Sequence, residues 1–138
     1  MNYNDTSCSN EKSLIINTFN TQLFEFFDDI QCVVTGDSSI EKAKNALLII
    51  KKINPSLIIK IWYVYIYSKY KIEIENSNIN FFIEKDYKED LEYLHKSDEI
   101  IKNIDKIKEP IKNMTKENQD KSFKYIKNLC MLSKLYTE

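Results

Sequence analysis

The sequence predicts an all-α protein, a compact bundle of five to seven helices in a single domain. Apolar residues recur at steps of three and four along most of the chain, as they do on the buried faces of helices. Glycine occurs once and proline twice, so few positions interrupt a helix. A chain of 138 residues with 43% hydrophobic residues is long and apolar enough for one core.

The first predicted helix begins at Glu11 and follows a polar N-terminal tail, residues 1–10, that we expect to be flexible. Residues 11–138 form the predicted helical domain. The apolar side chains of this helix lie on one face: Ile16, Phe19, Leu23, Phe26, Phe27, Ile30 and Val33. Gly36 follows in a polar break, where a turn with positive φ suits glycine.

A second helix is predicted from Ser38, which forms a capping box with Glu41. Its apolar face consists of Ile40, Ala43, Leu47 and Ile50. Asn54 and Pro55 end this helix, because proline disfavours helical geometry in the preceding residue. Pro55 also suits the first turn of the next helix, with Asn54 as its N-cap.

Residues 57–75 allow two interpretations. They are rich in β-branched and aromatic residues, and residues 70–75 alternate like a strand. No second strand-like run lies nearby, and a lone strand would leave its backbone groups without partners. We therefore predict a central helix that is apolar nearly all round, with a strand as the alternative.

Shorter helices are predicted toward the C-terminus. Asp86 and Glu89 form a capping signature ahead of Leu91 and Leu94. A further helix ends near Pro110 and buries Ile100, Ile101, Ile104 and Ile107. The last helix is capped by Thr115 and buries Phe123, Ile126, Leu129, Cys130 and Leu132.

The charged residues limit the class of partner that the sequence predicts. Every basic residue is lysine, and without arginine a base-reading nucleic-acid binder is less expected, although lysine still contacts phosphate. The net charge of −1 predicts no general attraction to DNA or to membranes. One lysine against five carboxylates gives residues 1–34 a net charge of −4, and nine lysines against six carboxylates give residues 99–138 a net charge of +3. This asymmetry can orient a partner or a self-association, or it can be an unevenly charged solvated surface.

No residues indicate catalysis or a cofactor. Cys8, Cys32 and Cys130 are odd in number and widely spaced, which argues against disulfides and for a reducing, intracellular compartment. We expect Cys32 and Cys130 to be small core residues. His95 is the only histidine and has no local catalytic partner, so the sequence predicts that the protein is not an enzyme.

No metal, phosphate or membrane site is predicted either. Asp28, Asp29 and Asp37 flank a turn and can attract a divalent cation, but a helix end followed by a polar loop explains them. One glycine cannot build a phosphate-binding loop, and no small-molecule substrate is indicated. The most apolar stretch, residues 57–67, is shorter than the roughly 20 residues needed to span a bilayer.

The aromatic run of residues 62–70, with Lys60, Lys69 and Lys71 within it or beside it, allows three interpretations. It fits a core helix whose tyrosine hydroxyls reach the surface, a surface for a partner protein, or a platform on which bases stack. The last helix adds a series of lysines that Glu117 and Asp120 dilute at its start. The candidate partner or nucleic-acid surface consists of Lys116, Lys121, Lys124, Lys127, Lys134, Tyr67 and Tyr70.

Four segments carry a family resemblance: FN-x-x-L-x-x-F-x-D-D at residues 19–29, Asn54-Pro55, FF-x-x-KDY at residues 81–87, and KYI-x-NL-x-x-LS at residues 124–133. Over residues 17–136 the chain resembles a family of small helical proteins from giant DNA viruses, of the mimivirus and phycodnavirus kind. Abundant Ile, Asn and Lys, typical of an AT-rich genome, agree with that resemblance. It implies a viral protein of the host cytoplasm, the viral factory or the virion, with no catalytic residues.

Two hypotheses of function follow. The first is a non-enzymatic viral structural or accessory protein that binds another protein or itself. The alternative is a nucleic-acid-binding accessory protein that uses the lysine-rich last helix, in which case its binding depends on salt.

Overall fold

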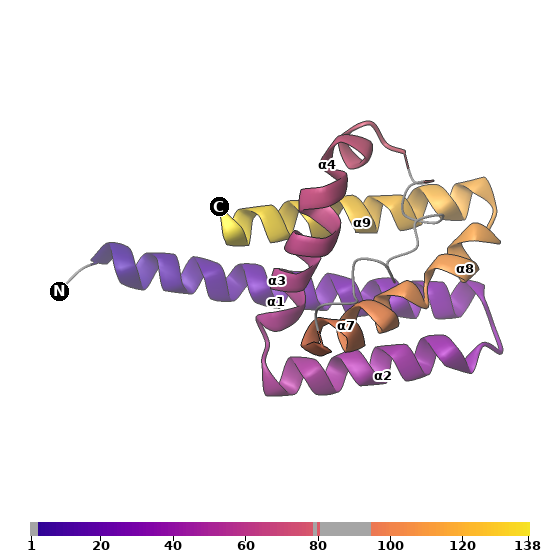
Figure 1. Ribbon diagram of the computed structural model, residues 1–138, viewed down its shortest axis with the longest axis horizontal. Coiled ribbons are helices and arrows are strands. Elements are labelled where there is room, and N and C mark those ends of the chain that lie inside the picture. Colours follow the sequence, from indigo (N-terminus) through magenta and orange to yellow (C-terminus); the bar gives the residue numbers. More distant parts are fainter. Residues whose placement is uncertain (1–2, 79, 81–94) are drawn as a thin grey trace.

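The computed structural model describes residues 3–78, 80 and 95–138, and within them it is an all-α bundle with no strand (Figure 1). Its elements are α1 (Tyr3–Val33), α2 (Ser38–Ile53), α3 (Leu57–Trp62), the π-helix η1 (Tyr63–Tyr67), α4 (Ser68–Glu75), α7 (His95–Asp105), α8 (Lys108–Lys112) and α9 (Lys116–Thr137). The predicted fold class is confirmed. The capping signature at Asp86 and the FF-x-x-KDY segment lie outside the described residues.

Helix α1 begins at Tyr3, eight residues before the predicted start at Glu11. The predicted tail, residues 1–10, is therefore helical from Tyr3 onward. No glycine or proline interrupts the stretch, and extending an existing helix costs far less than nucleating one. The N-terminal end of α1 projects beyond the rest of the bundle (Figure 1).

The turn between α1 and α2 contains Gly36, whose φ of +87° explains the glycine. The N-cap of α2 is Asp37 and not the predicted Ser38. The Asp37 carboxylate accepts hydrogen bonds from the backbone N–H of Ser39 (2.9 Å) and from the Ser39 hydroxyl (2.6 Å). A carboxylate makes both bonds and also suits the positive end of the helix dipole.

This cap predicts an acid-dependent loss of stability. The Ser39 hydroxyl, followed by the Ser39 backbone N–H, lowers the pKa of Asp37 from its ordinary value of 3.8. The stabilisation is therefore complete above that ordinary value and is lost as the pH falls through the lower pKa of the folded state. We expect wild type to lose more stability than Asp37→Asn between about pH 5 and pH 2, since asparagine caps without titrating. Urea unfolding across this range measures the difference, and identical acid dependence would contradict it.

Residues 57–75 are helical, as predicted, so the strand alternative is wrong. The helix begins at Leu57, two residues after Pro55. The N-cap of α3 is Ser56 and not the predicted Asn54, whose side chain accepts hydrogen bonds from the backbone N–H and the hydroxyl of Ser56 just before the helix. The stretch continues through the π-helix, and Tyr70 marks a kink with φ −123° and ψ 22°.

The core lies where α3 and η1 cross the pair formed by α1 and α9 (Figure 1). Helices α1 and α9 run antiparallel, with Phe26 of α1 stacked on Tyr125 of α9 at a ring-centroid distance of 5.0 Å. Trp62 is 0% exposed and meets the Phe19 ring edge-to-face at 5.9 Å. The predicted central position of this helix is confirmed, because α3 contacts α1, α2, α7 and α9.

The C-terminal elements partly follow the prediction. Thr115 caps α9, and its side chain accepts a hydrogen bond from the N–H of Asn118 (3.3 Å). The predicted apolar face of α9 is buried at Phe123, Ile126, Leu129 and Cys130, with Leu132 half-buried. Helix α7, however, ends at Asp105, and Pro110 lies within α8. Proline is tolerated there because the first turn of a helix needs no N–H donor.

Candidate functional site

The structure separates the seven residues of the candidate surface. Four lysines of α9 are exposed and one is half-buried: Lys116, Lys121, Lys124 and Lys127, then Lys134. Tyr67 is 8% exposed and Tyr70 is half-buried, so the fold covers much of both rings. Burial therefore favours the core interpretation for most of the aromatic run, and only parts of Tyr63 and Tyr67 face a surface groove.

Side chains from the acidic N-terminal region and from the basic C-terminal region line one cavity between α1 and α9. A cavity of about 410 Å³ between α1 and α9 is lined by Glu25 and Asp29 on one side and by Lys121 and Lys124 on the other. Burial, followed by the charges of Asp29 and Glu25, raises the pKa of Tyr125 in the same cavity. The structure thus brings two carboxylates of the acidic N-terminal region and two lysines of the basic C-terminal region to the same cavity.

A second concave region lies on the other side of α9, against α4 and η1. Two cavities of about 270 and 400 Å³ share Tyr67, Glu75 and Lys134, so they form one continuous depression that we call the α4–α9 groove. It is further lined by Tyr63, Ser68, Lys71, Ile74, Lys127, Asn128, Cys130, Met131 and Glu138. The structure therefore brings Tyr67 together with Lys127 and Lys134, as the candidate surface requires. Lys116, Lys121, Lys124 and Tyr70 do not line the groove.

The π-helix forms one wall of this groove. In η1 the backbone N–H of Ser68 bonds to the carbonyl of Tyr63, a five-residue step in place of the usual four. The rings of Tyr63 and Tyr67 lie 5.5 Å apart and both line the groove, while Ile66 points into the core. Such π turns often occur at functional sites.

Two exposed apolar residues beside the groove were missed by the sequence analysis. Met131 lines the groove and is 58% exposed, and Leu135, one turn later on α9, is 62% exposed. Their four-residue spacing, offset from the buried face of α9, is the sequence signal that could have identified them. Met131, Leu135, Lys127 and Lys134 together form what we call the α9 strip.

Cys130 is buried at the floor of the groove, where Trp62 Nε1 donates a hydrogen bond to its Sγ (3.2 Å). Burial raises the pKa of this thiol to about 12, and the Trp62 hydrogen bond opposes the shift only in part. The prediction that Cys130 is a core residue is confirmed. For Cys32 the same prediction is wrong, because its side chain is exposed on the side of α1 away from Ile30.

These environments predict different thiol reactivity. At about pH 8 only about one in ten thousand Cys130 side chains is the reactive thiolate, and the side chain is also covered. We expect iodoacetamide to modify Cys130 in the folded protein at least about a hundredfold more slowly than Cys32. Peptide mapping after timed labelling measures both rates, and labelling in urea should make them similar. Equal rates in the folded protein would contradict the burial of Cys130.

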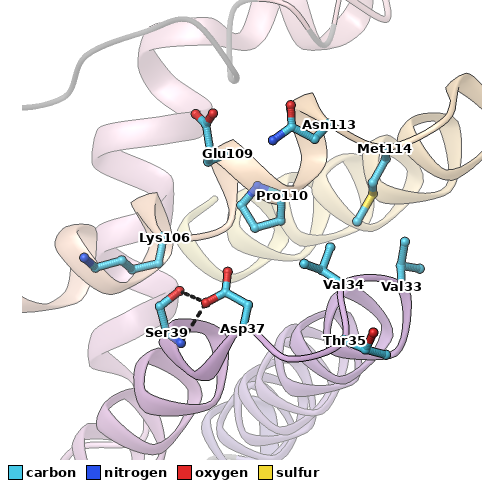
Figure 2. A pocket seen from close by; sticks show the side chains of 10 residues that line it. All are labelled: Val33, Val34, Thr35, Asp37, Ser39, Lys106, Glu109, Pro110, Asn113 and Met114. Carbon is cyan, nitrogen blue, oxygen red and sulfur yellow. Dashed lines mark hydrogen bonds between the residues drawn. The ribbon is translucent and has the colours of Figure 1, made fainter.

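Another cavity, of about 670 Å³, lies where the α1–α2 turn faces α7 and α8 (Figure 2). Val33, Val34, Pro110 and Met114 form its apolar part, and Lys106 and Glu109 lie at its rim with Asp37. The Asp37 carboxylate is already engaged by Ser39, as Figure 2 shows. The cavity therefore offers no free cluster of polar groups that converge on a ligand.

The three aspartates considered for a cation are used separately. Asp28 pairs with Lys44 of α2, Asp29 lies in the α1–α9 cavity, and Asp37 caps α2. Among the described residues no three His, Cys, Asp or Glu side chains are grouped to hold a metal ion. The side chain of His95 lies outside the described part.

No helix in the described ranges is both long and apolar enough to cross a bilayer. No protein-family model, curated protein or solved structure matches the chain. The α4–α9 groove is lined by the rings of Tyr63 and Tyr67, by the exposed Met131 and by charged side chains of both signs: Lys71, Lys127, Lys134, Glu75 and Glu138.

Proposed function

We propose that this protein is a non-enzymatic structural or accessory protein, viral as the family resemblance implies, that binds another protein through the α4–α9 groove. The observation that carries the proposal is the exposure of Met131 and Leu135 beside a ready-made depression. Burying a Met or Leu side chain contributes about 1.5–3 kcal/mol, which a partner that covers both would gain. Methionine also adapts its shape to irregular partners.

In this proposal the protein acts inside the host cell, at the viral factory or in the virion, and it needs no cofactor. Cys130, the buried thiol of the groove, stays protonated and so serves packing. The side chains around it offer a surface of mixed apolar and charged character, which suits a protein interface.

The test is an affinity pull-down from cells that express the gene, with every recovered protein identified. Wild type is compared with Met131→Ser/Leu135→Ser and with a matched control, Leu14→Ser/Ile53→Ser, which removes two other exposed apolar side chains. We expect one defined partner that wild type and the control recover, that the groove variant loses, and that survives nuclease treatment. Equal recovery by all three proteins would refute the groove as the binding site.

The nucleic-acid alternative has one observation in its favour, the meeting of Tyr67 with Lys127 and Lys134 in the groove. Bases stack on aromatic rings beside such cations. Against it, Glu25 and Asp29 lie beside Lys121 and Lys124 and reduce the positive field that phosphate would meet. Recovery that disappears with nuclease, together with salt-dependent binding of a single-stranded oligonucleotide, would favour this alternative.

A further inference from the structure

The α9 strip differs in charge from the rest of the molecule. Between Asp120 and Glu138 helix α9 carries four lysines and no carboxylate. Lys121 and Lys124 face the carboxylates of α1, whereas Lys127 and Lys134 line the α4–α9 groove. In the described part of the chain neither Lys127 nor Lys134 has an ion pair, and Lys127 lies 5.8 Å from the Phe123 ring.

The spacing within the α9 strip places apolar and basic side chains on one line. Residues 127, 131, 134 and 135 are separated by steps of three and four, so they follow one another along one side of the helix. The result is an apolar pair, Met131 and Leu135, edged by two ammonium groups. Two carboxylates also line the groove: Glu75 on the α4 side, which lines both cavities, and Glu138 after the end of α9.

We propose that the α4–α9 groove receives an acidic amphipathic helix of a partner protein. This inference rests on the proposed function and specifies the chemistry of the partner. Apolar side chains of that helix cover Met131 and Leu135, and its flanking carboxylates pair with Lys127 and Lys134. Apolar contacts in the centre supply affinity, and complementary charge at the edge supplies orientation and specificity.

Charge separates this occupant from the others. A second copy that docked by the same surface would bring its own Lys127 and Lys134 against these lysines, because a two-fold interface pairs identical patches. A nucleic-acid backbone offers no apolar group to cover Met131 and Leu135, which are 58% and 62% exposed. An acidic helix satisfies the lysines and the apolar pair at the same time.

The experiment uses two labelled synthetic helical peptides of equal length. Both carry leucines at steps of three and four, one with glutamates and the other with lysines at the flanking positions. Fluorescence anisotropy with the full chain should show saturable binding of the acidic peptide and none of the basic peptide. We expect added salt to weaken the binding, because the pairs at the edge are screened.

The variants test which side chains bind. We expect Lys127→Glu/Lys134→Glu and Met131→Ser/Leu135→Ser each to weaken the acidic peptide at least about tenfold. The matched control is Lys52→Glu/Lys102→Glu, which reverses two exposed lysines outside the groove and should leave affinity unchanged. Circular dichroism and urea unfolding confirm that each variant is folded.

Three results would overturn the inference: equal binding of both peptides, an oligonucleotide that displaces the acidic peptide and is lost in the same variants, or a stable dimer of the protein that excludes the peptide. Failure here is distinguishable from failure of the proposed function. If the pull-down partner depends on Met131 and Leu135 but the acidic peptide does not bind, only the inferred partner chemistry is wrong. If the peptide binds but no partner depends on the groove, the proposed function is wrong.

Discussion

Replacing Trp62 with alanine is expected to lower the free energy of unfolding by about 3–5 kcal/mol. The indole is 0% exposed and lies at the crossing of α3 with α1 and α9. Its loss removes the edge-to-face contact with Phe19, removes the hydrogen bond to Cys130 Sγ and leaves a cavity that rigid helices cannot fill. Urea unfolding followed by circular dichroism measures the change in stability.

The matched control for this prediction is Ile53→Ala. Ile53 ends α2 and is 80% exposed, so we expect its replacement to change stability by less than about 0.5 kcal/mol. A loss below about 1 kcal/mol for Trp62→Ala would show that the indole does not occupy the centre of the core.

The second large effect is expected for Asn20→Asp, at about 3 kcal/mol or more near neutral pH. Asn20 is 1% exposed, and its Nδ2 donates a hydrogen bond to the Pro55 carbonyl oxygen (3.0 Å). Aspartate has nearly the same shape but loses this donor and brings a negative charge against the carbonyl oxygen. The cost arises from burying a charge with no compensating partner.

Two comparisons test that cause. Asn17→Asp makes the same change at an exposed position of the same helix and should alter stability by less than about 0.5 kcal/mol. The deficit of Asn20→Asp relative to wild type should shrink as the pH is lowered toward about 4, because protonation removes the charge and restores a donor. A deficit that is constant with pH would mean that shape and not charge is responsible.

These residues show how far a sequence can predict a site. The spacing of apolar residues correctly identified most of the buried faces of α1, α2 and α9, because burial in a helix depends on which residues share one side. Val33, which was predicted on the buried face of α1, is 42% exposed at the end of that helix. The same spacing also predicted that Cys130 is buried. The prediction that Cys32 is a core residue was wrong, because a two-residue step from the buried Ile30 places Cys32 on the opposite side of α1. The N-cap of α2 is Asp37, one residue before the predicted Ser38.

The candidate surface changed more than the fold did. The lysines of the last helix were predicted to form one surface. In the structure Lys121 and Lys124 line the cavity between α1 and α9, whereas Lys127 and Lys134 line the α4–α9 groove. The offset of Met131 and Leu135 from the buried face of α9 is a sequence signal of their exposure, but only the packed structure places Met131 in a groove. One wall of the groove is formed by the π-helix η1, which no local sequence pattern predicted.

The all-α fold and most of the buried helix faces could be predicted from the amino-acid sequence. These properties follow from local periodicity, from a scarcity of helix breakers and from caps such as Thr115. Which charged side chains share a cavity, and which apolar side chains stay exposed beside the groove, depends on how the helices pack. Both depend on residues far apart in the sequence, such as Asp29 beside Lys124 and Tyr67 beside Met131, that come together when α1 and η1 pack on α9.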